Sequence, residues 1–338
     1  MAARGAVGEH RPLAHLVGRL GHSFNIIAGS IRHRFELKHL SNSRQTRPTL
    51  IMIHSSQETL EKRPSLFNLP SQDRVLEIGT AYGNANPFPH TVLDNFLVSE
   101  LHPQHVKYPE LSWAGWSQFH DGYQYGKRVC NELDLFPAML RELTIEACQP
   151  RFLNFLEDLT QIRGLIPDPY LNGGGLHSSG EGGILAPHTD FHIYDKLGLY
   201  RRLNLLVYFN SEWADGDGGA LELSKKGSPT PTASILPIFG RAVIFNTDDI
   251  SVHGFTKPVA SGKRRNSLAL YYYTANEVGV FSGDRTTHWQ QHGSSSGLRG
   301  ARISVYKGLL LGSRMSKLAH MANPNKGSVV HTGITPER

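Results

Sequence analysis

The stretches Ala-Pro-His-Thr-Asp-Phe-His at 186–192 and Val-His-Gly at 252–254 decide how this chain is organised. Side chains alternate between the two faces of a strand, so His188 and Asp190 point to the same side. If His253 arrives from another strand, two imidazoles and one carboxylate surround a single point. That set of donors suits Fe(II) and leaves coordination positions open. We therefore expect His188, Asp190 and His253 to hold a metal ion.

A third motif, Arg-Arg-Asn-Ser at 264–267, predicts a site for a carboxylate. Alternation along a strand places Arg265 and Ser267 on one face. A guanidinium offers a rigid fork for a carboxylate, and a neighbouring hydroxyl adds a further hydrogen bond. Arg264 and Lys263 compete for the same role. Because alternation cannot place both arginines inside, the pairing of Arg265 with Ser267 is favoured.

These motifs resemble the signature of the Fe(II)/2-oxoglutarate-dependent oxygenases, and the surrounding sequence is similar to their prolyl 4-hydroxylase-like branch. The matching pieces are GGGLH at 173–177, RRLNLLVYFN at 201–210, GGALEL at 218–223 and SLALYYY at 267–273. The resemblance implies a mainly β chain with flanking helices, of the α+β class. Its core would be a double-stranded β-helix, which is a jelly-roll or cupin-like barrel.

The resemblance also implies cofactors and an activity. Fe(II) would be held by His188, Asp190 and His253, with 2-oxoglutarate and O2 as cosubstrates and ascorbate as an optional reductant. Arg265 and Ser267 would bind the distal carboxylate of 2-oxoglutarate. The enzyme would be a dioxygenase that hydroxylates an unactivated C–H bond of a small molecule or peptidyl residue, with succinate and CO2 as coproducts. Halogenating relatives lack the carboxylate ligand, so Asp190 favours hydroxylation.

Several alternatives stay open at this point. Tyr208 matches the position whose hydroxyl assists at the distal carboxylate, but it also fits a buried core tyrosine. His192 would face inward as a wall of the substrate pocket or as a further imidazole, and His177 would be a structural residue or approach the metal. A cupin-like metal enzyme that does not use 2-oxoglutarate would keep the triad without needing Arg265. A non-catalytic metal-binding barrel is the third class, and oligomeric state is not readable.

Composition and charge set limits on partners and location. The 338 residues include two cysteines, too few for a disulfide framework, so a reducing, cytoplasmic location is the default. The net charge of +6 lies in residues 1–50, where eight basic residues face two acidic ones, and the remainder is neutral. A neutral remainder argues against a nucleic-acid-binding face. No apolar window is long enough for a membrane span.

Four segments are expected along the chain. Residues 1–55 form a basic extension that is disordered, directs the protein to an organelle, or precedes a true start at Met52. Residues 56–170 form a helical lead-in, 171–276 the catalytic barrel, and 277–338 a loosely structured extension to which we assign no chemistry.

The local patterns predict helices and strands as follows. Helices are expected from Ser99 through 105, from Pro137 through 147 and from Pro150 through 160. Val75–Gly83 predicts a strand and a glycine turn; it resembles a methyltransferase cofactor loop, but no further βα units follow. In the barrel, strands are expected around 177 and over 184–188, 203–210, 220–223, 242–246 and 266–274.

Overall fold

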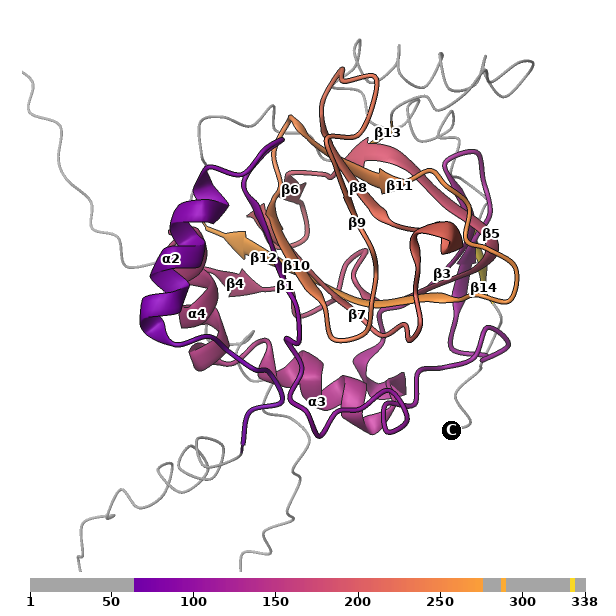
Figure 1. Ribbon diagram of the computed structural model, residues 1–338, viewed down its shortest axis with the longest axis horizontal. Helices are drawn as coiled ribbons and strands as arrows, with labels where there is room; N and C mark the ends of the chain where they lie inside the picture. Colours follow the sequence, from indigo (N-terminus) through magenta and orange to yellow (C-terminus); the bar gives the residue numbers. More distant parts are fainter. Residues whose placement is uncertain (1–63, 276–286, 290–328, 332–338) are drawn as a thin grey trace, which may run out of the picture. The chain divides into compact units, whose positions relative to one another are not determined.

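The computed structural model describes residues 64–275, 287–289 and 329–331 (Figure 1). The predicted extension at 1–55 and almost all of 277–338 lie outside the described residues. The helices are α2 (Gln72–Gly83), α3 (Ala138–Glu146) and α4 (Pro150–Thr160), with 3-10 turns at Leu133–Leu135 and Asp215–Asp217. The strands are β1 (His90–Leu93), β2 (Ser117–Phe119), β3 (Gln124–Cys130), β4 (Ile166–Pro167), β5 (Gly175–Thr189), β6 (Ile193–Tyr194), β7 (Leu199–Tyr208), β8 (Leu221–Lys225), β9 (Ala233–Ile235), β10 (Ala242–Asn246), β11 (Ser251–Phe255), β12 (Arg265–Thr274), β13 (His288–Trp289) and β14 (Val329–His331).

The strands form the double-stranded β-helix that the sequence predicts. The main path runs β1-β10-β7-β12-β5-β11-β8-β9, and the neighbours along it are antiparallel. Strand β5 joins the two halves, because its first residues pair with β12 while Leu185 and His188 pair with β11. On its other edge, β5 pairs with β3.

The prediction of two separate strands around 177 and 184–188 was wrong, because one strand of 15 residues covers both. Its middle contains Gly182, whose φ of +72° is a conformation that glycine adopts without steric cost. The partner strand is also irregular there, with Gly126 at a φ of +65° between two register positions. Strand β5 therefore bends at Gly182 while its pairing with β3 continues on both sides of the bend.

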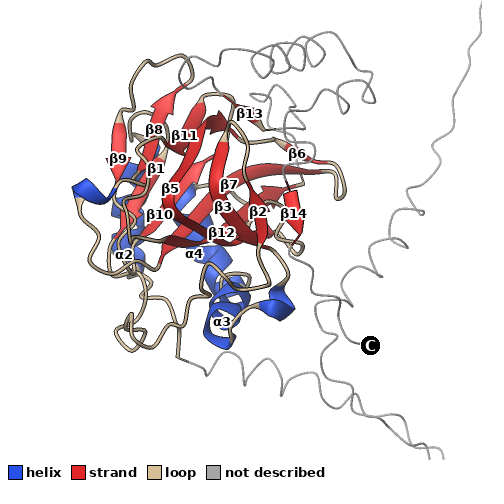
Figure 2. Cartoon of the chain, turned by 90° about the vertical axis from the view of Figure 1, so that its right-hand side faces the viewer, coloured by secondary structure: helices blue, strands red, loops and turns tan. Residues whose placement is uncertain are grey.

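The two faces of β7 and β12 have different neighbours, as alternation predicts. Leu268 and Leu270 point outward and share a core with the buried side of the helices, including Phe152 and Leu156 of α4. Ala269 and the neighbouring inward residues pack inside the barrel. Figure 2 shows the helices on one side of the strands. Burial of each large apolar side chain in this layer contributes roughly 1.5–3 kcal/mol to the free energy of folding.

Two predictions about the lead-in were wrong and two were close. Residues 75–83 belong to helix α2, not to a strand, because Val75 and Tyr82 lie seven residues apart and are both buried on one helical face. Gly79 lets α2 approach the backbone of α4, since an added Cβ would lie 2.8 Å from the carbonyl oxygen of Leu159. The segment after Ser99 forms turns and no helix. Helices α3 and α4 begin within one residue of the predicted prolines.

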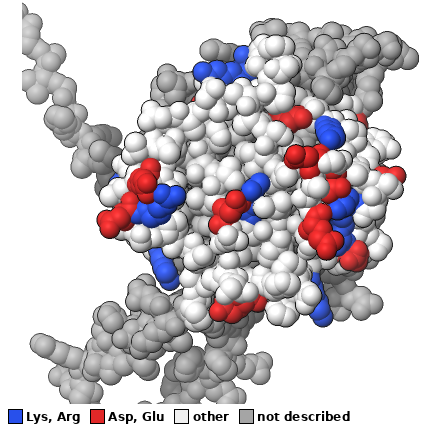
Figure 3. Space-filling model, in the orientation of Figure 1, with Lys and Arg blue, Asp and Glu red and all other residues white. Residues whose placement is uncertain are grey.

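Charge on the described surface is mixed. On the face in Figure 3, basic and acidic side chains lie together in small groups separated by uncharged surface. None of the helices in the described ranges is long and apolar enough to cross a membrane.

Candidate metal centre

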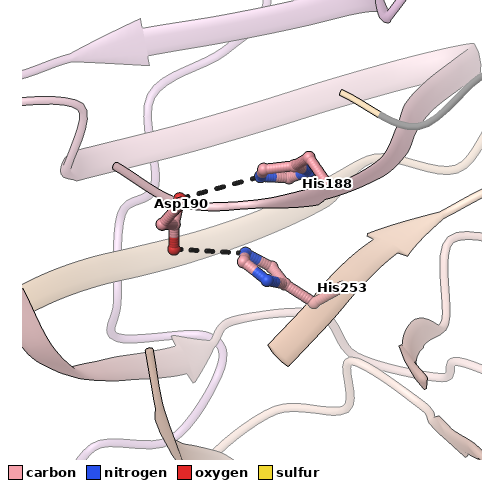
Figure 4. Close-up of side chains that lie close together, drawn as sticks. All are labelled: His188, Asp190 and His253. Atoms are coloured by element: carbon pink, nitrogen blue, oxygen red, sulfur yellow. Dashed lines mark ion pairs between the residues drawn. The ribbon is translucent and has the colours of Figure 1, made fainter. Parts of the chain in front are cut away.

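The side chains of His188, Asp190 and His253 converge where the end of β5 pairs with β11 (Figure 4). The register places His188 directly opposite His253, and Asp190 follows one residue after β5 ends. One donor atom from each residue lies within 4.8 Å of the other two. Nε2 of His188 is 3.8 Å from Oδ1 of Asp190, and Nε2 of His253 is 3.5 Å from Oδ2. The two sequence motifs thus place their donor atoms in one cluster.

Both imidazoles are fixed by the backbone of their own strand. Nδ1 of His188 lies 2.9 Å from the carbonyl oxygen of Ala186, and Nδ1 of His253 lies 3.2 Å from that of Ser251. A proton on each Nδ1 donates to these carbonyls and leaves the Nε2 lone pair free to bind a metal. Burial lowers the pKa of His188 to about 3 and also lowers the pKa of His253. Both rings are therefore neutral at pH 7, the form that ligates.

The carboxylate of Asp190 is held by two buried partners. Its Oδ2 is 2.9 Å from Nη2 of Arg201 and accepts a hydrogen bond of 2.8 Å from Nδ2 of Asn204. Burial alone would raise the pKa of Asp190, but Arg201 and the two histidines hold that pKa below its usual range. Asp190 is therefore ionised and orientated before any metal arrives.

Sequence reasoning missed Arg201, because a bulge breaks the alternation. Counting by two from Asn204 places Arg202 inside the barrel. In the pairing with β12, the next partner after Leu203 is Arg201 and not Arg202, although only one residue of β12 has passed. The extra residue turns Arg201 inward, where it is 1% exposed and its guanidinium carbon lies 3.5 Å from the ring centroid of Tyr271.

The cluster fits a divalent metal by its chemistry. Two neutral imidazoles and one ionised carboxylate form the donor set that suits Fe(II). Within the described ranges, no other three histidine, cysteine or acidic side chains come this close. His192 lies elsewhere, with Nδ1 3.3 Å from Oδ1 of Asp249, and Nε2 of His177 lies 3.1 Å from the carbonyl oxygen of Gly173.

Arg265 lies on the interior face of the barrel, the face that carries the metal triad. Its guanidinium is 6% exposed, donates from Nε to the carbonyl oxygen of Gly219 at 2.7 Å, and donates from Nη2 to the hydroxyl of Tyr208 at 3.1 Å. Ser267 is paired with Tyr208 across the strands, so the two share this face. Gly219 is closely fitted, since an added Cβ would lie 3.1 Å from Cδ of Arg265. The structure thus brings the three predicted anchor residues together.

Arg264 points to the opposite side of the same strand, as alternation predicts. It forms an ion pair with Glu110 outside the barrel. A surface groove of about 1490 Å³ runs beside Arg264 and Asn266 and includes none of the triad. The two neighbouring arginines therefore lie in separate environments.

Residues 174–273, which contain the triad and Arg265, match the family model described as the 2OG-Fe(II) oxygenase superfamily. This segment is thus similar in sequence to the 2OG-Fe(II) oxygenases.

Solved structures similar to this chain include two prolyl hydroxylases. The prolyl 4-hydroxylase of Pseudomonas putida is 15% identical with a TM-score of 0.40, and the match covers 61% of this chain and 100% of that one. The prolyl hydroxylase of Trichoplax adhaerens is 18% identical with a TM-score of 0.39, covering 60% and 90%. The epimerase SnoN from nogalamycin biosynthesis is 12% identical with a TM-score of 0.42, covering 66% and 88%. No curated protein sequence matches the chain.

A second residue that sequence reasoning missed, Trp289, lies against the metal triad. Strand β13 pairs with the end of β5, where Trp289 is opposite His188. The Trp289 ring centroid is 4.6 Å from that of His188 and 5.1 Å from that of Tyr123, on which it stacks. Sequence reasoning gave residues after 277 no chemistry, and nothing in the local sequence around Trp289 signals a return to β5.

Proposed function

We propose that the protein is an Fe(II)- and 2-oxoglutarate-dependent dioxygenase that hydroxylates an unactivated C–H bond of a small molecule or peptidyl residue. Arg265 carries this proposal. It is a buried cation beside the metal triad, and the described residues give its guanidinium hydrogen bonds only to a carbonyl and a hydroxyl. A metal barrel that does not use 2-oxoglutarate has no need for such a buried fork, whereas a dicarboxylate cosubstrate does.

The roles follow from the contacts. Fe(II), 2-oxoglutarate and O2 together supply the oxidising power, with succinate and CO2 as coproducts. His188, Asp190 and His253 would hold the ion. The guanidinium of Arg265 would donate hydrogen bonds to the distal carboxylate of 2-oxoglutarate. Burial raises the pKa of Tyr208, so its hydroxyl stays protonated and can donate to the same carboxylate or accept from Arg265. Ser267 adds a hydroxyl on the same face.

The side chains around the triad also limit access of water. The ring of Phe245 lies 4.9 Å from that of His253, and Trp289 lies against His188. Apolar surfaces against the ligands lower the local dielectric and strengthen the charged contacts inside the site. Asp190 supports hydroxylation, since it leaves no ligand position for a halide.

The test compares two neighbouring arginines. Arg265→Lys keeps the charge but loses the fork, so the apparent constant for 2-oxoglutarate should rise by about tenfold to hundredfold, with a smaller change in maximal rate. Arg264→Lys, on the outer face, should change little. The measurements are absorbance on mixing Fe(II) with 2-oxoglutarate without oxygen, and succinate formation in a substrate screen.

Two results would contradict the proposal. Equal effects of the two substitutions would show that Arg265 does not bind the cosubstrate. If Fe(II) and 2-oxoglutarate give no absorbance without oxygen, and 2-oxoglutarate is not consumed, the metal triad serves a different reaction.

A further inference from the structure

Besides Arg265 and Arg201, the interior face carries a further cation, Lys127, two strands away from Arg265. In the ladder, Lys127 of β3 is opposite Ser179 of β5, and Ser179 is opposite Arg265 of β12. Directly opposed residues in antiparallel strands project from the same face of the sheet. Lys127 therefore projects to the side occupied by Arg265. Strands are about 4.8 Å apart, so the two Cα atoms are separated by roughly 10 Å.

The outward residues of the same strands confirm this assignment of faces. Ser178 is opposite both Arg128 and Asn266, and the Ser178 hydroxyl donates to Oδ1 of Asn266 at 2.8 Å. Cys130 and Leu176, which are also opposed, join the outer core beneath the helices. The face of β3 that contains Lys127 is thus the interior one.

The ammonium of Lys127 interacts electrostatically with the metal triad. Burial lowers the pKa of Lys127 to about 8, with Asp190 opposing that shift, so the group stays charged at pH 7. Its charge in turn helps to lower the pKa of both His188 and His253, after the larger effect of burial. Within residues 64–275, 287–289 and 329–331 the ammonium has no hydrogen bond or ion pair, and it lies 6.0 Å from the ring centroid of Phe119.

The two acidic groups that raise the pKa of Lys127, Asp190 and Asp121, already have other described partners. Arg201 is neutralised by Asp190, and the distal carboxylate of 2-oxoglutarate would neutralise Arg265. Asp121 lies in the turn before β3, where its Oδ1 accepts two backbone N–H groups of that turn. A half-buried cation that forms no ion pair with any described residue favours the arrival of an anion.

The hairpin that carries Lys127 also contacts the metal triad through Trp289. Tyr123, in the turn before β3, stacks on Trp289, which itself lies against His188. The carbonyl oxygen of Tyr123 accepts a hydrogen bond of 2.7 Å from the amide of Ala186. The β2–β3 hairpin is therefore anchored beside the triad, where the molecule to be oxidised must lie.

We propose that Lys127 determines specificity by binding an anionic group, a carboxylate or phosphate, of the substrate that is oxidised. This inference rests on the proposed function, since it takes Arg265 to be the anchor of 2-oxoglutarate. The substrate is then an acid whose oxidised carbon lies at the metal while its anionic oxygens contact the ammonium. An Arg at this position would keep the contact, whereas a neutral side chain would remove it.

The experiment uses the full chain loaded with Mn(II) and saturated with 2-oxoglutarate. Paramagnetic relaxation of propionate protons and of phosphate phosphorus reports binding near the metal, with propionamide as the neutral probe. The wild-type protein should enhance the relaxation of propionate or phosphate but not of propionamide. Lys127→Met should weaken anion binding by about tenfold or more, and Lys127→Arg should retain it. Arg128→Met, which removes the next basic residue from the outer face, should behave as the wild type.

Three outcomes decide the matter. If propionate and phosphate relax equally with wild type and Lys127→Met, Lys127 does not bind the substrate anion. If Lys127→Met weakens the binding of 2-oxoglutarate and not that of the anion probes, the lysine belongs to the cosubstrate site and the proposal is wrong. If Mn(II) or 2-oxoglutarate does not bind the wild type, the proposed function fails. Lys127 is then judged by whether propionate or phosphate raises the melting temperature of wild type more than that of Lys127→Met.

Discussion

Replacing Arg201 by Met should destabilise the protein far more than the same change at Arg202. Arg201 is fully buried, pairs with Asp190 at 2.9 Å and donates to Oδ1 of Asn204 at 2.7 and 3.1 Å. Removing one partner of a buried ion pair leaves an uncompensated charge and costs about 3–5 kcal/mol. For a domain of this size each kcal/mol lowers the melting temperature by about 2–4 °C, so the expected fall is roughly 6–20 °C.

The assay is thermal unfolding of the full chain followed by circular dichroism, without added metal. Arg202 is the matched control, because it is half-buried and its described hydrogen bond, to Thr274, is 3.4 Å long. Arg202→Met should cost less than about 1 kcal/mol. Adding Asp190→Asn to Arg201→Met removes the orphaned charge and should recover part of the loss. Equal losses in the two single variants would show that the inward turn of Arg201 at the bulge is wrong.

The remaining predictions concern the triad and its aromatic neighbour. Alanine at His188, Asp190 or His253 should abolish turnover and weaken Mn(II) binding by at least about tenfold while the fold persists, as measured by succinate formation, metal titration and circular dichroism; full activity of Asp190→Ala would contradict the triad. Because Trp289 stacks beside His188, Co(II) binding should quench tryptophan fluorescence, and Trp289→Phe should remove most of that quenching; unchanged quenching in Trp289→Phe would mean that another tryptophan reports the metal.

The sequence predicted the parts of the site that depend on strict alternation. His188 and Asp190 lie two residues apart and converge, and Arg265 and Arg264 lie on opposite faces as their spacing requires. Tyr208 was left open between an anchor and a core residue, and the structure places its hydroxyl on Arg265. These features depend only on the period of a strand, which local sequence specifies.

The parts that sequence could not predict depend on irregular backbone or distant pairing. Arg201 turns inward only because of a bulge, and a single extra residue cannot be located from a period-two pattern. The strand from 175 to 189 is continuous because glycines absorb a bend that otherwise signals a turn. Trp289 reaches His188 through a short pairing with no pattern of its own. Helix α2 was mistaken for a strand because Val75 and its apolar neighbours fit both periods over so short a stretch.

Strand β5 has two edges, and only one of them pairs with strands inside the segment that matches the superfamily model. One edge pairs with β12 and then β11, both inside the segment shared with the superfamily, residues 174–273. The other edge pairs with β3 and then β13, both outside that segment. His188, Asp190, His253 and Arg265 thus lie inside the matched segment, whereas Lys127 and Trp289 lie on strands outside it. On the roles proposed for Arg265 and Lys127, substitutions in β3 would change which substrate binds while leaving the metal ligands and the cosubstrate anchor in place.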